Sequence, residues 1–238
     1  MEAVERAASR LSQSFDRRHV LQYGSPAGSG HYLDACASFL SRELHDQKVD
    51  ARTLFATPGN SGGLALVTRT LTRPGDRVFM EDPSYFLAHQ VFRDHFLDLV
   101  PLPQRAGDDA YGTLDIDNVA KVLWKEKYLS TATAGHPMPR LLYCVPTGNN
   151  PTGRDMPDDD RSRLVQLCAE HNVRIVSDDV YEVLQYGEEP SNRPKPMRWH
   201  ANALGVPSTV ISLGSWSKII GPGLRLGWIE AEDEALHD

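Results

Sequence analysis

The apolar positions of the chain follow two alternating spacings. In some windows they recur three and four residues apart, as with Leu33, Ala37, Leu40 and Leu44, which is typical of an amphipathic helix. Between these windows lie short apolar runs bounded by turn-forming residues, which are typical of buried strands. The helical windows are 33–46, 61–72, 84–94, 115–128 and 158–171, and the strand runs are 53–56, 77–80, 97–101, 141–145, 174–177, 209–214 and 224–231. Strands that alternate with helices predict an α/β fold: a doubly wound, mostly parallel sheet with helices on both faces.

Polar residues refine this picture at the ends of the elements. Asp115 is a good N-cap for the helix expected at 115–128, and the acidic run Asp158–Asp160 suits the positive end of a helix dipole. Two stretches, 129–140 and 187–207, are rich in proline, glycine or polar residues, so we expect them to be loops within one domain.

Composition narrows the class of protein. Hydrophobic residues make up 40% and charged residues 24% of the 238 residues, which excludes a disordered or collagen-like chain. The net charge of −7 argues against a nucleic-acid partner, which usually requires a basic face. Because no apolar run approaches the roughly 18 residues of a membrane helix and no signal peptide is visible, we expect no membrane association and a cytoplasmic location.

The three cysteines, Cys36, Cys144 and Cys168, are odd in number and lack CxxC spacing. This pattern supports neither a disulfide framework nor a zinc site. We expect each cysteine to be a small core residue in a reducing compartment, and we expect no bound metal.

Chemically useful residues follow five of the predicted strands. In an open parallel sheet, ligands bind beyond the carboxyl ends of the strands. The segments found there are ATPGNSGG, EDPSYF, PTGNNPTG, DDVY and SWSKIIGPGLR. We therefore expect their turns, aromatic residues, acids and lysine to converge on one crevice.

Lys218 lies between hydroxyl residues and a Gly-Pro-Gly turn. A lysine at a strand end, partly desolvated and near other cations, has a lowered pKa and can form a Schiff base. An isolated lysine in such a loop is more simply a surface residue, but here Ser215, Ser217 and Arg225 provide the groups that bind a phosphate. The segment NSGG at 60–63 adds backbone N–H donors at a helix start. Neither a GxGxxG loop nor a GxxxxGK[ST] loop is present, so the expected phosphate does not belong to a nucleotide.

Asp178 and Tyr181 stand three residues apart at a strand end and can face the same ring. Taken alone, the acidic pair Asp178-Asp179 is more simply a helix-capping turn. Asn150 alone reads as a turn residue, and Tyr85 alone as a core aromatic.

Together, the motifs NNPTG, DDVY and SWSKIIGPGLRLGW, in this order along the chain, resemble those of fold-type I pyridoxal-phosphate enzymes of the class I/II aminotransferase family. The nearest resemblance is to 2-aminoadipate/kynurenine-type aminotransferases and to the aminotransferase-like domains of GntR-type regulators. The resemblance covers roughly 22–231. It implies a pyridoxal-phosphate-binding large domain at 22–238, preceded by a partial N-terminal segment at 1–21.

The resemblance also implies a role for each candidate residue. Lys218 forms the Schiff base and moves the proton between substrate Cα and cofactor, and Asp178 keeps the pyridine nitrogen protonated. Tyr181 and Asn150 hydrogen-bond the phenolate oxygen of the ring, and Tyr85 stacks on its face. The phosphate is surrounded by Asn60, Ser61, Ser215, Ser217 and Arg225, and Asp179 is structural.

The chain departs from the family pattern in three places. Asn60-Ser61 stands where Ser-Gln is common, and Trp216 where Phe or Tyr is common. The C-terminal small domain, whose arginine grips the substrate α-carboxylate, is not visible, so we expect an incomplete form that does not transaminate alone.

The resemblance makes amino acids and 2-oxo acids the expected substrates and a homodimer the expected assembly, with Tyr23 near the partner subunit or the pocket entrance. Two alternatives stay open at this point. One is another fold-type I reaction, such as that of a lyase or decarboxylase, and the other is a regulator effector module or fragment that binds the cofactor without turnover.

Overall fold

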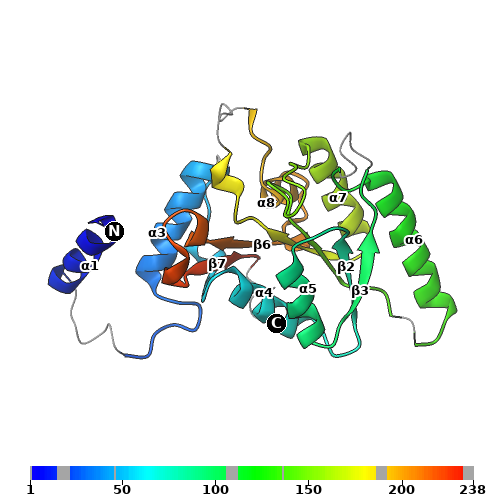
Figure 1. The fold of residues 1–238 in the computed structure, drawn as a ribbon, viewed down its shortest axis with the longest axis horizontal. Helices are drawn as coiled ribbons and strands as arrows, with labels where there is room; N and C mark the ends of the chain where they lie inside the picture. Colours follow the sequence, from blue (N-terminus) through cyan, green and yellow to red (C-terminus); the bar gives the residue numbers. More distant parts are fainter. Residues whose placement is uncertain are drawn as a thin grey trace.

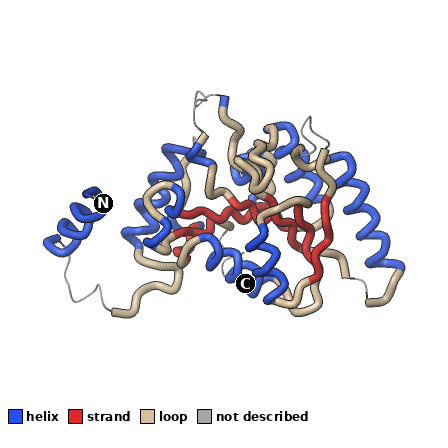
Figure 2. Tube along the Cα trace, viewed as in Figure 1, coloured by secondary structure: helices blue, strands red, loops and turns tan. Residues whose placement is uncertain are grey.

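The computed structural model describes residues 2–14, 22–45, 47–105, 112–135, 137–185 and 192–232. In this part of the chain a single seven-stranded sheet runs between layers of helices (Figure 1, Figure 2). Its strands are β1 (Leu54–Thr57), β2 (Arg77–Glu81), β3 (Asp98–Leu102), β4 (Leu141–Cys144), β5 (Arg174–Asp178), β6 (Val210–Ser215) and β7 (Gly227–Glu230).

The strand order is β1-β7-β6-β5-β4-β2-β3. Strands β3, β2, β4, β5 and β6 pair in parallel, whereas β7 is antiparallel to both β6 and β1. Because Gly227 at the start of β7 pairs with both Ser215 and Thr57, the carboxyl ends of β1 and β6 reach the same edge of the sheet as those of β2, β4 and β5. The mostly parallel sheet predicted from the sequence is confirmed, and its carboxyl edge is where the candidate segments lie.

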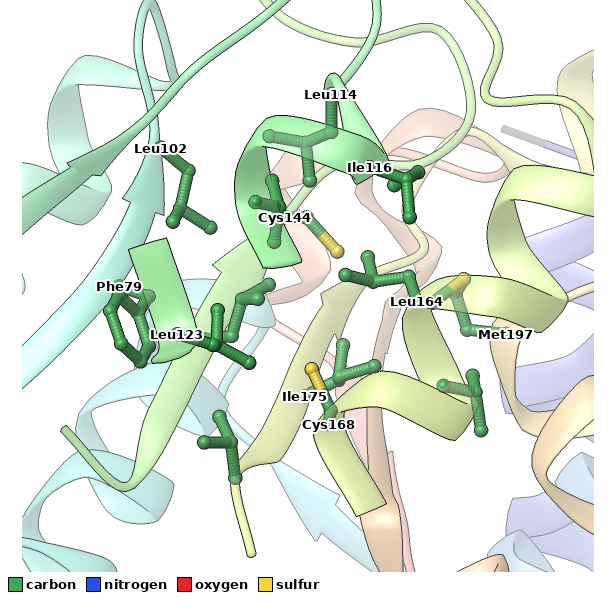
Figure 3. Packing of buried hydrophobic residues seen from close by; sticks show 14 of the residues in the cluster. Phe79, Leu102, Leu114, Ile116, Leu123, Cys144, Leu164, Cys168, Ile175 and Met197 are labelled. Carbon is green, nitrogen blue, oxygen red and sulfur yellow. The ribbon is translucent and has the colours of Figure 1, made fainter. Parts of the chain in front are cut away.

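Helices cover both faces of the sheet, as predicted. The α-helices of the described residues are α1 (Glu2–Ser14), α3 (Gly30–Leu40), α4 (Asn60–Leu71), α5 (Phe86–Asp94), α6 (Ile116–Ala132), α7 (Asp158–Glu170) and α8 (Met197–Ala203), of which α3 to α8 pack on the sheet. Adjacent strand residues face opposite sides, so Phe79 packs with α6, α7 and α8, whereas Val78 and Met80 pack with α4 and α5. Figure 3 shows the first of these clusters, in which Leu123 and Leu164 meet Ile175.

A third cluster lies at the β1 edge, where Leu33, Cys36 and Leu40 of α3 pack against Leu54 and Trp228. All three cysteines are buried and free of disulfides, as expected. Helix α1 stands apart from the sheet in Figure 1. The expected domain boundary after residue 21 falls at the end of a range, 15–21, that lies outside the described residues.

Several expected element limits were wrong. The stretch 187–207, expected to be a loop, contains α8, whose Met197 and Ala201 are buried four residues apart; two apolar positions are too few to give a helical pattern. Helix α6 continues to Ala132, into the other expected loop. The helix expected at 33–46 is α3 followed by a π-helical turn, Ser41–His45.

The strand expected at 224–231 is also shorter than predicted, because Arg225 has a left-handed backbone (φ 45°) and cannot continue a strand. The predicted cap is confirmed, since the Asp115 side chain accepts a hydrogen bond from the Asn118 amide. None of the helices in the described residues is long and apolar enough to cross a membrane.

Candidate active site

A cavity of about 310 Å³ opens at the carboxyl edge of the sheet. It is lined by residues from all five strand-end segments, Val180 and Pro222 included, together with Leu87 and Val145. All ten sequence-predicted site residues line it: Asn60, Ser61, Tyr85, Asn150, Asp178, Tyr181, Ser215, Ser217, Lys218 and Arg225. The expected convergence on one crevice is therefore what the fold produces. Tyr23, expected near a partner subunit, is fully exposed and is not among the lining residues.

Lys218 reaches the cavity from the short helical turn Trp216–Lys218 that follows β6. The Ser215 side chain caps this turn by accepting a hydrogen bond from the Ser217 amide at 3.1 Å. The two serine hydroxyls also bond each other at 2.9 Å. Lys218 Nζ lies 5.9 Å from the centroid of the Tyr181 ring, so the amine and the phenol share one side of the cavity.

Asp178 ends β5 and is buried, and its two carboxylate oxygens differ in their partners. Oδ2 accepts hydrogen bonds from Tyr143 Oη at 2.6 Å and from Asn60 Nδ2 at 2.8 Å. Oδ1 is buried without a hydrogen-bond partner among the described residues. Burial raises the pKa of Asp178, and the bonds from Tyr143 and Asn60 oppose that rise. A buried acceptor without a partner costs about 1–3 kcal/mol, so the geometry is suited to a ligand that brings a donor.

Asn60 has a different contact from the one expected. Its side-chain amide donates to Asp178, and its backbone N–H is a separate donor that could contact a phosphate. That N–H lies at the start of α4, where the free amides of the first helical turn form an anion site.

Arg225 lies beside this helix start. Its guanidinium donates to the carbonyl oxygens of Pro222 at 3.0 Å and Pro58 at 3.4 Å. Gly59, with φ of 83°, precedes α4, and a Cβ atom there would come within 2.7 Å of Arg225 Nη2. Glycine is favoured at this position by its backbone conformation, and a Cβ atom there would displace the end of the Arg225 side chain.

Asn150 and Tyr181 are brought together by the loop after β4. Gly148 in this loop has φ of 54°, and a Cβ atom there would lie 3.4 Å from Tyr181 Cβ. The loop therefore packs directly on the residue that follows β5.

Sequence reasoning missed the residues behind the cavity. Tyr143 lies within β4, where every side chain is buried, so no pattern marks it. Glu81 ends β2 and accepts hydrogen bonds from the Val145 amide and Asn149 Nδ2, both at 2.9 Å. Burial, together with the charge of Asp178, raises the pKa of Glu81 to about 8. The sequence did contain a signal for Glu81, because this charged residue directly follows the strand run 77–80 and so lies at the carboxyl end of that strand.

Asp179 takes the structural role expected of it. It accepts hydrogen bonds from the hydroxyls of Ser177 and Ser212, and it is not among the residues that line the cavity. Burial raises the pKa of Asp179, and the charge of Glu182 adds to that rise.

The sequence model of the family described as Aminotransferase class I and II matches residues 1–238. The chain belongs to this family. It is 32% identical over 213 residues to aromatic-amino-acid aminotransferase 1 of Thermococcus litoralis, covering 90% of this chain and 46% of that protein. It is also 32% identical over 235 residues to 2-aminoadipate transaminase of Thermus thermophilus, covering 99% of this chain and 52% of that protein.

Solved structures give the same result for this class I and II aminotransferase chain. LysN, the α-aminoadipate aminotransferase of Thermus thermophilus complexed with N-(5'-phosphopyridoxyl)-L-leucine, superposes with a TM-score of 0.81 at 30% identity. The kynurenine aminotransferase of Pyrococcus horikoshii superposes with a TM-score of 0.81 at 26% identity. Each match covers 99% of this chain and 54% or 53% of the solved chain, so the chain spans about half the length of these relatives.

The donor set of the cavity matches what a phosphorylated pyridine requires. The unpartnered Oδ1 of Asp178 suits a ring N–H, and the Lys218 amine suits an aldehyde carbon. The start of α4, the two serines and Arg225, which line the same cavity, suit a phosphate dianion.

Proposed function

We propose that the cavity binds pyridoxal 5'-phosphate and that the protein transfers an amino group from an amino acid to a 2-oxo acid. The observation that carries the proposal is the buried, unpartnered Oδ1 of Asp178 in the same cavity as Lys218. Membership of the class I and II aminotransferase family supports the reaction type. The names of the relatives support aromatic amino acids and 2-aminoadipate as the first substrates to test.

The cofactor supplies an electron sink when the Cα–H bond of the substrate breaks. Lys218 would hold the cofactor through its side-chain amine, and that amine would move the proton at substrate Cα. Asp178 keeps a proton on the ring nitrogen, because a buried carboxylate stabilises the adjacent cation. Tyr181 and Asn150 would hydrogen-bond the phenolate oxygen, and Tyr85 would pack against the ring.

Residues 22–238 form the cofactor-binding domain in this proposal, and Ser61, Ser215, Ser217 and Arg225 hold the phosphate together with the Asn60 amide. A homodimer is supported by exposed apolar side chains beside the cavity, namely Phe86, Leu87, Ile220 and Leu224. The three buried free cysteines support a reducing compartment, and we propose the cytoplasm.

The test is covalent mapping. The chain is incubated with pyridoxal phosphate, reduced with borohydride, digested and sequenced by mass spectrometry. We expect one phosphopyridoxyl label, on Lys218, and none in Lys218→Ala. A label on another lysine, or equal labelling of the variant, would contradict the assignment. Half-reactions with glutamate, 2-aminoadipate and phenylalanine, run on the complete open reading frame because residues 1–238 are not expected to transaminate alone, then test the reaction type.

A further inference from the structure

The loop that carries Asn150 is anchored to the sheet by one carboxylate oxygen. Glu81, at the end of β2, is buried and is not among the residues that line the cavity. Its Oε2 accepts from the Val145 amide and from Asn149 Nδ2, each at 2.9 Å. Because β2 and β4 are neighbours in the sheet, this oxygen joins the end of one strand to the start of the loop after the other.

Asn149 links Glu81 to the turn that follows it through hydrogen bonds of its side chain. While its Nδ2 donates to Glu81, its Oδ1 accepts from the Thr152 amide at 3.3 Å and from the Thr152 hydroxyl at 3.0 Å. Asn149 is itself buried, with 6% of its surface exposed. The next residue, Asn150, lines the cavity. The bond from Asn149 to Glu81 therefore ties the residue next to Asn150 to the end of β2.

We propose that Glu81 is a positioning residue that, through Asn149, holds the Asn150 amide against the phenolate oxygen of the cofactor. This inference rests on the proposed function of the cavity. In this role Glu81 acts as a hydrogen-bond acceptor, and its negative charge is not required. The raised pKa of Glu81 agrees with this, because a carboxyl group with a pKa of about 8 is largely protonated at neutral pH. Glutamine should then replace it well, since its amide oxygen accepts the same two bonds.

The experiment measures the dissociation constant of pyridoxal phosphate in a double-mutant cycle of Glu81→Leu and Asn150→Ala. Glu81→Leu removes the acceptor and is expected to weaken binding about three- to tenfold, the equivalent of one hydrogen bond. The double variant should bind no more weakly than Asn150→Ala alone, because Glu81 acts through Asn150. Glu81→Gln should bind within about twofold of the wild type.

A matched control is Glu126→Leu. Glu126 is also buried, on α6, and pairs with Arg77 at the opposite end of β2. Its loss should lower the melting temperature without changing the dissociation constant. Amide hydrogen exchange on the cofactor-free chain adds a direct readout: exchange at Val145 should speed up in Glu81→Leu and not in Glu81→Gln.

Additive losses in the cycle would overturn the positioning role, as would a Glu81→Gln variant that binds as weakly as Glu81→Leu. If Glu81→Leu does not fold, Asn149→Ser removes the same link and the same cycle applies. A wild-type chain that binds no pyridoxal phosphate would overturn the proposed function, whereas a binding wild type with an additive cycle would overturn only the role of Glu81.

Discussion

Arg161 is a fully buried cation on α7, and replacing it should be among the most damaging single changes in the chain. Its side chain has 0% exposure, and its ion-pair partner Glu182 has 1%. Thr147 Oγ1 completes the group by donating to Glu182 at 2.6 Å. The guanidinium donates to five oxygens at 2.7–3.0 Å: those of Met156, Pro146 and Lys195 main-chain carbonyls, Thr147 Oγ1 and Glu182 Oε1.

Substituting Arg161 by methionine keeps much of its volume and removes all five bonds. Glu182 is then a buried carboxylate without its cation, and breaking a buried pair in this way costs about 3–5 kcal/mol. Small and medium domains have a free energy of unfolding of about 5–15 kcal/mol. The change should therefore remove a large fraction of the stability. Adding Glu182→Leu removes the stranded charge and should recover at least half of the loss.

The measurement is urea unfolding followed by circular dichroism at a fixed temperature. The matched control is Arg163→Met, two residues along the same helix, whose ion pair with Asp117 is exposed and whose loss should leave the urea midpoint nearly unchanged. A loss below about 1 kcal/mol for Arg161→Met, or a double variant no more stable than the single one, would refute the view that Glu182 is left uncompensated.

Three further results are expected. In the complete open reading frame, Asp178→Asn should still bind pyridoxal phosphate but slow proton abstraction severely in single-turnover kinetics, because an amide cannot hold a pyridinium charge. Asp179→Asn should affect mainly stability, and equal kinetic damage from the two changes would contradict the assignment. Gly59→Ala should weaken phosphate binding, measured by titration with inorganic phosphate, because its Cβ would come within 2.7 Å of Arg225 Nη2. Above about pH 4.5 the unfolded chain has released the proton of Glu81, whereas the folded state keeps it up to about pH 8. The free energy of unfolding of the wild type should therefore fall as pH rises towards 8, by up to about 1.4 kcal/mol per pH unit. The urea midpoint of Glu81→Gln should fall less steeply over the same range.

The sheet and the site-bearing segments could be predicted because both follow from short-range rules. Buried strands show as apolar runs, and the carboxyl ends of parallel strands share an edge. Asp178 and Lys218 are forty positions apart in sequence, yet the strand-end rule places both at one cavity, and the structure does so too. Helix α8 could not be predicted by such short-range rules, because its burial depends on contacts with α7 and β6 and not on a periodic apolar pattern in its own sequence.

The partners of Asp178 could not be predicted, because they depend on register. Tyr143 pairs with Val176 across β4 and β5, and this pairing brings the phenol to the end of the neighbouring strand. A one-residue slip would turn the ring to the other face of the sheet. Asn60 likewise reaches Asp178 only because β1 ends at the same edge as β5, through the antiparallel strand β7. Nothing local in the sequence specifies either contact.

The hydrogen-bond partners of four buried acids at this edge explain why only one of these acids is available to bind a ligand. Strands β2 and β5 and the turn after β5 bring Glu81, Asp178, Asp179 and Glu182 into the interior, where each charge is costly. Three of them are committed to internal donors: Glu81 to the loop after β4, Asp179 to two serines, and Glu182 to Arg161 and Thr147. Within the described residues, Asp178 alone among these four lines the cavity and keeps a buried oxygen without a partner. Because the two side-chain donors, Tyr143 and Asn60, both bond Oδ2, Oδ1 is held in one orientation before any ligand arrives, which is the condition for a strong bond to a cationic ring nitrogen.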